Sequence, residues 1–306
     1  MTDGSAVKRD NVALAIAAIV ASVFALSLGD AVIKAFSVSF PLAQIFVLRS
    51  LLALPVLAFI LVLRGKGRAW LPLVLGWTAL RSFLLVGMWV FYYAALPHIQ
   101  LSVAAAAAYT SPLLITLLAA LVGGERVGRM GWFAVALGFV GVMIMLRPQA
   151  GAFNAYGLLP LGAAFCYACA MVMTRTKCQR EDPVVLSLAL NVAFILVGGV
   201  TSLAILVFGL AQSIGADNPF LFGAWTSLGT TEWSMLGVLA AAIIVGSLGA
   251  AIAYQMAPSS IVAPFDYSYL AFATLWGLIV FSEVPDGVTI LGILMIACAG
   301  MLAVRR

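Results

Sequence analysis

Four charged residues stand inside long apolar stretches of the sequence, where their chemistry needs an explanation: Asp30, Arg49, Arg81 and Asp266. A charge placed in a lipid bilayer costs on the order of 3 kcal/mol, so each one kept there needs a partner, water or a function. At such depth a carboxylate or a guanidinium group can bind a charged part of a substrate, carry a proton or form a structural ion pair.

The two arginines differ in their expected depth. Arg81 lies about 18 Å along a helix from Trp70, too deep for its side chain to reach the surface comfortably. We expect it to face a wet or polar cavity and to bind substrate, with a structural ion pair as the alternative. Arg49 lies about 12 Å from Pro41, where its side chain can still reach the interface, so a structural or gating role stands beside a role in the cavity.

The two acids also have local explanations. Asp30 and Lys34 are four residues apart, a spacing that forms an ion pair on one helix face, so both are expected to be structural or gating residues. Asp266 follows Pro264 in the first turns of a predicted helix, where a carboxylate can cap free backbone amides. A buried carboxylate is also the usual proton-coupling group of a carrier. Both interpretations remain open, and capping is the one we favour.

Aromatic side chains with polar tips are costly to strand in lipid, and several lie deep in the apolar stretches. Trp89 and Tyr93 share a helix face at their spacing of four residues. We predict that a cavity is lined by Arg81, Asp266 and the aromatic residues Trp89, Tyr93, Tyr109, Tyr167, Tyr254, Tyr267 and Tyr269.

Catalytic and metal chemistry find little support. Cys166 and Cys169 have a CxxC spacing, but they lie in an apolar run without a second pair, and His98 is the single histidine. No convincing nucleophile and acid accompany His98, and no Walker-type phosphate loop occurs. We therefore expect no metal, no cofactor and no enzymatic activity. A membrane enzyme acting on lipid would need clustered His, Asp or Glu at an interface, which the sequence lacks.

The elements that must position these residues follow from the composition, with 64% of the 306 residues hydrophobic and 9% charged. A soluble fold cannot hide so large an apolar surplus. At roughly 30 residues per span with its connection, the chain holds about ten membrane helices. Open strands cannot face lipid, so the predicted class is all-α. The predicted spans are 11–33, 41–63, 70–96, 101–123, 131–146, 155–174, 184–208, 233–256, 261–281 and 288–304.

Basic residues outside the spans gather on one side of this topology, and only Lys34 and Arg147 lie on the other side. The positive-inside rule makes that side, with both termini, cytoplasmic. The net charge of +5 is then explained by topology rather than by a nucleic-acid partner. The basic residues of this side are Lys8, Arg9, Arg64, Lys66, Arg68, Arg126, Arg129, Arg175, Lys177, Arg180, Arg305 and Arg306.

The two halves of the chain contain matching residue spacings. Pro41 stands eight residues before Arg49, as Pro183 stands eight before Asn191. Because five is an odd number of spans, a duplicated five-span unit must enter the membrane upside down in its second copy. The sequence therefore predicts two inverted units of five helices, residues 11–147 and 155–305. A second match is a spacing of sixteen residues, which separates Tyr109 from Glu125 and Tyr267 from Glu283.

Motifs stand at matching places in the halves: Ser111-Pro112 leading to Gly124-Glu125-Arg126, and Ala263-Pro264-Phe265-Asp266-Tyr267 leading through Ser282-Glu283-Val284-Pro285 to Gly300. They resemble the two repeats of the EamA family, in the drug/metabolite transporter superfamily. The resemblance implies a ten-helix basket, with a cavity lined chiefly by the first, third, fourth, sixth, eighth and ninth helices and with the fifth and tenth at the periphery. The recurring glutamates, at helix ends, are expected to be structural.

We therefore expect a multi-pass secondary carrier of the inner membrane that moves a small polar organic metabolite by alternating access. Amino-acid export, including aromatic and apolar amino acids, is the leading expectation, since aromatic and cationic groups suit zwitterions with apolar side chains. Uptake of a larger metabolite such as S-adenosylmethionine, riboflavin or a nucleoside is the alternative. The expected partners are the bilayer and the small-molecule substrate, and a monomeric carrier is compatible with these expectations.

Overall fold

The computed structural model describes residues 11–36, 40–65, 71–95, 107–146, 155–213, 215, 218–282, 284 and 286–304. Within these ranges the chain is helical and forms no strand, so the prediction of an all-α chain is confirmed. Six helices are long and apolar enough to cross a membrane: α1 (Val12–Phe36), α2 (Leu42–Leu63), α3 (Leu75–Ala95), α7 (Leu158–Thr176), α8 (Pro183–Val207) and α11 (Thr230–Met256).

The other helices are shorter. They are α5 (Ser111–Leu121), α6 (Arg129–Leu146), α12 (Ser259–Asp266), α13 (Ser268–Phe281) and α14 (Gly287–Val304), with the brief turns η1 (Ala155–Gly157), α9 (Leu210–Ser213) and α10 (Pro219–Phe222). Only Tyr267 separates α12 from α13, so the predicted ninth span is two helices. The count of ten spans stays a prediction, because the start of the predicted fourth span, residues 101–106, lies outside the described ranges.

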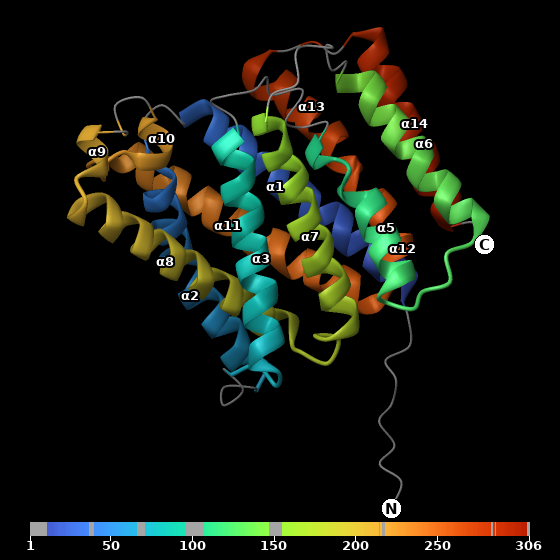
Figure 1. Ribbon diagram of the computed structural model, residues 1–306, viewed down its shortest axis with the longest axis horizontal. Coiled ribbons are helices and arrows are strands. Elements are labelled where there is room, and N and C mark those ends of the chain that lie inside the picture. Colours follow the sequence, from blue (N-terminus) through green and yellow to red (C-terminus); the bar gives the residue numbers. More distant parts are fainter. Residues whose placement is uncertain are drawn as a thin grey trace, which may run out of the picture.

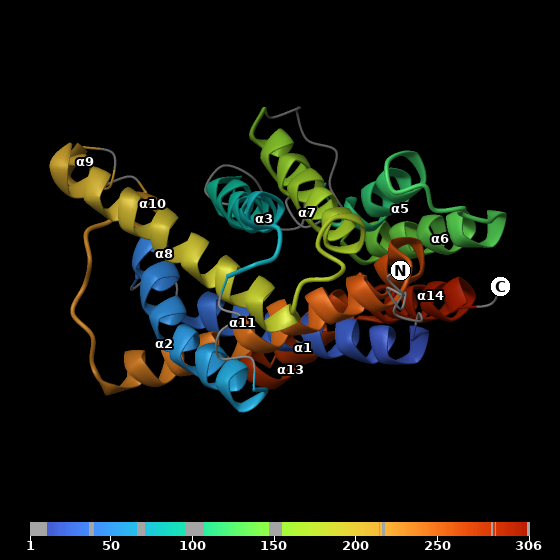
Figure 2. The ribbon, with the colours of Figure 1, turned by 90° about the horizontal axis from the view of Figure 1, so that it is seen from below.

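The helices pack in pairs that join the two halves of the chain. Helix α1 packs along α11, α3 along α7, α2 along α8 and α6 along α14, the last pair at one edge of the molecule (Figures 1 and 2). In the order of the chain, α1, α2, α3 and α6 correspond to α7, α8, α11 and α14. The pair α1–α11 then corresponds to the pair α7–α3, whereas α2–α8 and α6–α14 each correspond to themselves. This is the pattern that two related halves would produce, although the division at residues 11–147 and 155–305 stays a prediction.

The pair α1–α11 shows how glycine permits such packing. The two helices are antiparallel, since the backbone N–H of Asn11 donates to the carbonyl of Met256 at 2.8 Å. Two turns from the start of α1, a Cβ added to Gly249 would lie 2.6 Å from the carbonyl oxygen of Ala18. A residue without a side chain is therefore required for these backbones to approach.

The turn between α7 and α8 contacts the start of α3 and the end of α2. The buried carboxylate of Glu181 accepts hydrogen bonds from the backbone N–H groups of Leu73 and Val74, just before α3, at 3.0 and 2.6 Å. Arg64, after α2, forms an ion pair with Asp182 at 3.8 Å. The described basic residues of the predicted cytoplasmic side lie at this and the neighbouring helix ends, and the cytoplasmic assignment itself stays a prediction.

Glu125 has the structural role expected of it. Its carboxylate accepts hydrogen bonds from the backbone N–H groups of Ser259 and Ser260 at 2.8 and 3.1 Å, so it caps α12 from the loop between α5 and α6. Other residues used in the predictions lie outside the described ranges: Lys8, Arg9, Lys66, Arg68, Trp70, His98, Arg147, Glu283, Pro285, Arg305 and Arg306.

Candidate functional site

Asp30 of α1 is held by tyrosines from two other helices. Its Oδ1 accepts a hydrogen bond from Tyr93 of α3 at 3.5 Å, and its Oδ2 accepts one from Tyr269 of α13. The ion pair predicted with Lys34 is not described, because the side chain of Lys34 lies outside the described atoms. What the structure shows is that Asp30 connects α1 to α3 and α13, so its contacts are between helices rather than along one.

Asp266 has a similar arrangement with a different set of helices. Tyr254 of α11 donates to its Oδ2 at 2.5 Å, and Tyr167 of α7 donates to its Oδ1 at 3.2 Å. Asp266 is the last residue of α12, and α13 begins without a side-chain capping bond. The interpretation of Asp266 as a helix cap is therefore wrong, because its carboxylate bonds side chains of other helices.

Tyr109 extends the cluster around Asp30. Its ring packs against that of Tyr269, with centroids 5.6 Å apart, and Tyr269 donates to Asp30. Since Tyr269 follows Asp266 by three residues, the two buried acids, each with its tyrosine donors, belong to neighbouring parts of the interior.

Arg49 of α2 shares a small cavity with Asp30 and Trp89. The guanidinium lies over the ring of Phe194 at 4.4 Å and over that of Phe46 at 5.0 Å, and only 4% of the residue is exposed. The remaining lining comes from Leu26, Gly29 and Ile33 of α1 and from Leu239, Ala242 and Ile243 of α11. A cation, a carboxylate and aromatic rings therefore lie close together around this cavity.

The aromatic side of this cavity follows the predicted helix face. The rings of Trp89 and Tyr93 are stacked, with centroids 5.4 Å apart and planes at 19°, so the prediction that they share a face is confirmed. Tyr93 also contacts the ring of Phe220, at 5.5 Å. Tyr93 thus joins an aromatic stack to the carboxylate of Asp30.

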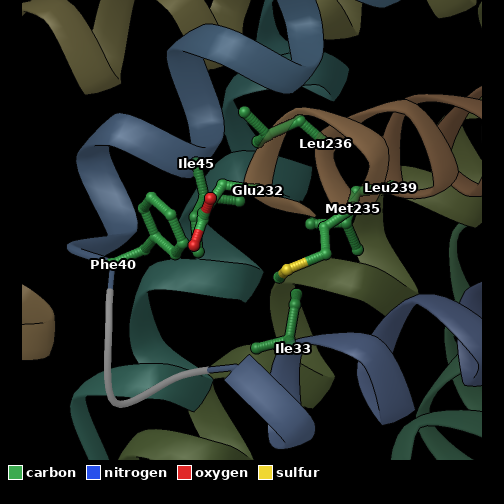
Figure 3. A pocket seen from close by; sticks show the side chains of 7 residues that line it. All are labelled: Ile33, Phe40, Ile45, Glu232, Met235, Leu236 and Leu239. Carbon is green, nitrogen blue, oxygen red and sulfur yellow. The ribbon is translucent and has the colours of Figure 1, made fainter. Parts of the chain in front are cut away.

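A second cavity continues from the first along α1 and α11. Figure 3 shows its lining, with Phe40 and Glu232 lying beside each other and Ile33 facing them across the space. Ile33 and Leu239 line both cavities, so the two are adjacent. Since Glu232 is in the first turn of α11, this second cavity lies nearer the helix ends than Arg49 does. The lining residues are Ile33, Phe40, Ile45, Glu232, Met235, Leu236 and Leu239.

Of the residues predicted for the cavity wall, only Trp89 lines one of the two cavities above, and Arg81 and Tyr267 make contacts of another kind. Arg81 lies between α3 and α7, where its Nε donates to Oγ1 of Thr174 at 2.6 Å, and it lines neither of the two cavities above. Its contribution to substrate binding stays a prediction. Tyr267 is fully buried toward α6 and donates to the carbonyl of Val135 at 3.4 Å, so the structure does not bring it to either carboxylate.

The sequence left the role of Arg49 open and did not include α2 in the cavity wall. A signal existed in the matched spacings of Pro41 to Arg49 and of Pro183 to Asn191. Asn191 is fully buried at the equivalent place in α8, which packs against α2. Within the described residues, no group of three or more metal-ligating side chains gathers anywhere.

Comparison with known proteins agrees with this architecture. Residues 13–147 match the EamA-like transporter family. The riboflavin transporter of Vibrio cholerae is 33% identical over 69% of this chain, and the chain spans 65% of that relative's length. The pseudopaline exporter of Pseudomonas aeruginosa is 26% identical, over 92% of this chain and 94% of its own.

More distant similarities extend the picture. The S-adenosylmethionine uptake transporter of Rickettsia prowazekii is 22% identical over 64% of this chain and 60% of its own length. A solved crystal structure of a protein superposes with a TM-score of 0.76 over 96% of this chain and 98% of its own, at 20% identity, which shows a shared fold. Residues 13–147 thus belong to the EamA-like transporter family, and the relatives named above are transporters.

Proposed function

We propose that this transporter is a secondary carrier of the inner membrane that moves small zwitterionic metabolites, amino acids foremost, by alternating access. The observation that carries the proposal is the cavity in which Arg49 and Asp30 face the same space beside Trp89. A cation and a carboxylate at one place complement the two charges of an amino acid, and the aromatic face complements an apolar side chain.

The surrounding architecture supports a carrier mechanism. The cavity lies between α1, α2 and α3 of the first half and α11 of the second, so it lies where the halves meet. Binding sites at the interface between two related units are typical of secondary carriers, in which one unit rocks against the other around the bound substrate.

Riboflavin is the second candidate substrate, and two observations favour it. The curated riboflavin transporters of Vibrio cholerae and Rhizobium johnstonii are 33% and 32% identical to this chain over the matched residues. Trp89 lines the cavity and stacks on Tyr93 behind it, so its ring offers a flat aromatic face for a fused ring system.

The test is counterflow in proteoliposomes loaded with one unlabelled compound and given the labelled form outside. The panel holds L-phenylalanine, L-leucine, riboflavin, S-adenosylmethionine and uridine, and protein-free liposomes are the control. We expect labelled amino acids to accumulate well above the control. Accumulation of riboflavin alone would replace the first candidate with the second, and no accumulation of any compound would contradict the carrier function for this substrate range.

A further inference from the structure

Arg49 leaves one edge of its guanidinium group free inside the protein. Its Nε and Nη2 are buried and have no hydrogen-bond partner among the described residues. These two nitrogens share one side of the planar group, and their N–H bonds point in the same direction. They are the pair that can donate two parallel hydrogen bonds to one acceptor with two oxygens.

The packing around Arg49 holds the guanidinium without occupying this edge. Phe194 and Phe46 contact the cation through their ring faces, at 4.4 and 5.0 Å, which leaves the in-plane N–H groups unused. Asp30, on the same cavity, has its two oxygens bonded by Tyr93 and Tyr269. A buried charged donor without an acceptor is costly, so an edge kept free in this way needs an acceptor, which a bound ligand can supply.

The position of this edge favours a mobile ligand. Arg49 lines the cavity that also holds Asp30 and Trp89, and the cavity of Figure 3 is adjacent to it through Ile33 and Leu239. Arg81 is the useful contrast. It is also buried and its Nη1 has no partner among the described residues, but its Nε donates to Oγ1 of Thr174, so its Nε–Nη2 edge is not free for a side-on acceptor.

We infer that the Nε–Nη2 edge of Arg49 binds the carboxylate of the transported metabolite side-on, which makes a carboxylate the group by which this transporter recognises its substrate. The inference rests on the proposed carrier function and narrows its substrate class. With the carboxylate on Arg49, a neighbouring ammonium group of the same molecule faces Asp30. Trp89, which stacks on Tyr93, then contacts the apolar part.

The test compares each acid with its uncharged amide on the purified full-length protein. The probes are L-phenylalanine, L-leucine and L-methionine, each beside its carboxamide, and the readout is the shift of the thermal unfolding midpoint with probe concentration. The amide keeps the ammonium group and the side chain but offers one acceptor oxygen instead of two. We expect at least one acid to raise the midpoint of the unsubstituted protein at about ten-fold lower concentration than its amide.

Matched variants assign the effect to one arginine. Arg49→Lys keeps the charge but loses the two-donor edge, and Arg49→Gln loses the charge as well. Both should remove the preference for acid over amide. Arg64→Lys, the same change at an exposed arginine at the end of α2, should keep it. The midpoint of each variant without probe reports its folding separately.

The outcomes separate this inference from the carrier function. The inference is overturned if no acid is preferred to its amide, if the preference survives in Arg49→Gln, or if it is lost in Arg64→Lys alone. None of these results bears on counterflow, so a protein that exchanges riboflavin but shows no acid preference remains a carrier with a different recognition group. Failure of counterflow together with an Arg49-dependent acid preference would instead contradict the carrier function and leave the carboxylate site standing.

Discussion

Tyr254 donates a 2.5 Å hydrogen bond to Oδ2 of Asp266, where α12 ends against the last turns of α11. Tyr167 completes the arrangement from α7, so one buried carboxylate is bonded by hydroxyl groups from two other helices. Both donors are neutral, and a carboxylate held this way can take up a proton without breaking an ion pair. Since α12 ends at this residue, a change in the charge of Asp266 acts at a break in the helical backbone.

Asp266→Asn tests whether this carboxylate couples transport to protons. Asparagine keeps the shape of the side chain but cannot ionise. We expect uptake driven by an imposed pH gradient to be lost in proteoliposomes, while substrate exchange at equal pH continues. Retention of both activities, with uptake that depends on the pH gradient as in the parent protein, would show that Asp266 carries no proton.

Tyr254→Phe should lower stability while keeping the carboxylate. The change removes a short, buried hydrogen bond to an acid, a loss of about 1.5–3 kcal/mol when the acid is charged. Tyr267→Phe is the matched control, because the hydroxyl of Tyr267 makes only a 3.4 Å contact with a carbonyl. Thermal unfolding in detergent should show the larger decrease for Tyr254→Phe, and equal decreases would contradict the strength assigned to the bond.

The sequence predicted contacts along single helices better than contacts between them. Trp89 and Tyr93 stack as expected because the helical period alone brings residues four apart to one face. Asp30 and Tyr269 are 239 residues apart, and only the tertiary packing of α1 against α13 brings them together. Residue spacing carries no information about which helices meet.

The depth of Arg49 shows a second limit. Counting residues from Pro41 assumed that the start of α2 lies at the membrane surface, within reach of the arginine. In the structure the first turns of α2 are themselves buried, from Leu42 to Val47, so the side chain has no such exit. The misplacement of Asp266 has a related cause, because the break at Tyr267 falls inside one apolar run that the sequence presents as a single helix.

Gly249→Ala should disturb the contact between α1 and α11. The new Cβ would lie 2.6 Å from the carbonyl oxygen of Ala18, a backbone atom, so the two helices must move apart. We expect a loss of about 1–3 kcal/mol, as for other overpacked interiors. Gly237→Ala is the control on the same helix, since a Cβ there meets no atom within 4 Å and should leave the unfolding midpoint unchanged or slightly higher.

The orientation in the membrane is tested by cysteine labelling at two exposed positions on opposite faces. Ser227 lies in the segment before α11, and Arg180 lies in the basic turn between α7 and α8. The native Cys166, Cys169, Cys178 and Cys298 are replaced first. Of these, Cys178 is fully buried, and burial raises the pKa of its thiol, so it reacts slowly in any case.

If the positive-inside rule assigns the basic face to the cytoplasm, an impermeant maleimide added to intact cells should label Ser227→Cys and spare Arg180→Cys until the membrane is opened. The reverse pattern would invert the topology, and labelling of both positions from outside would contradict the number of spans between them.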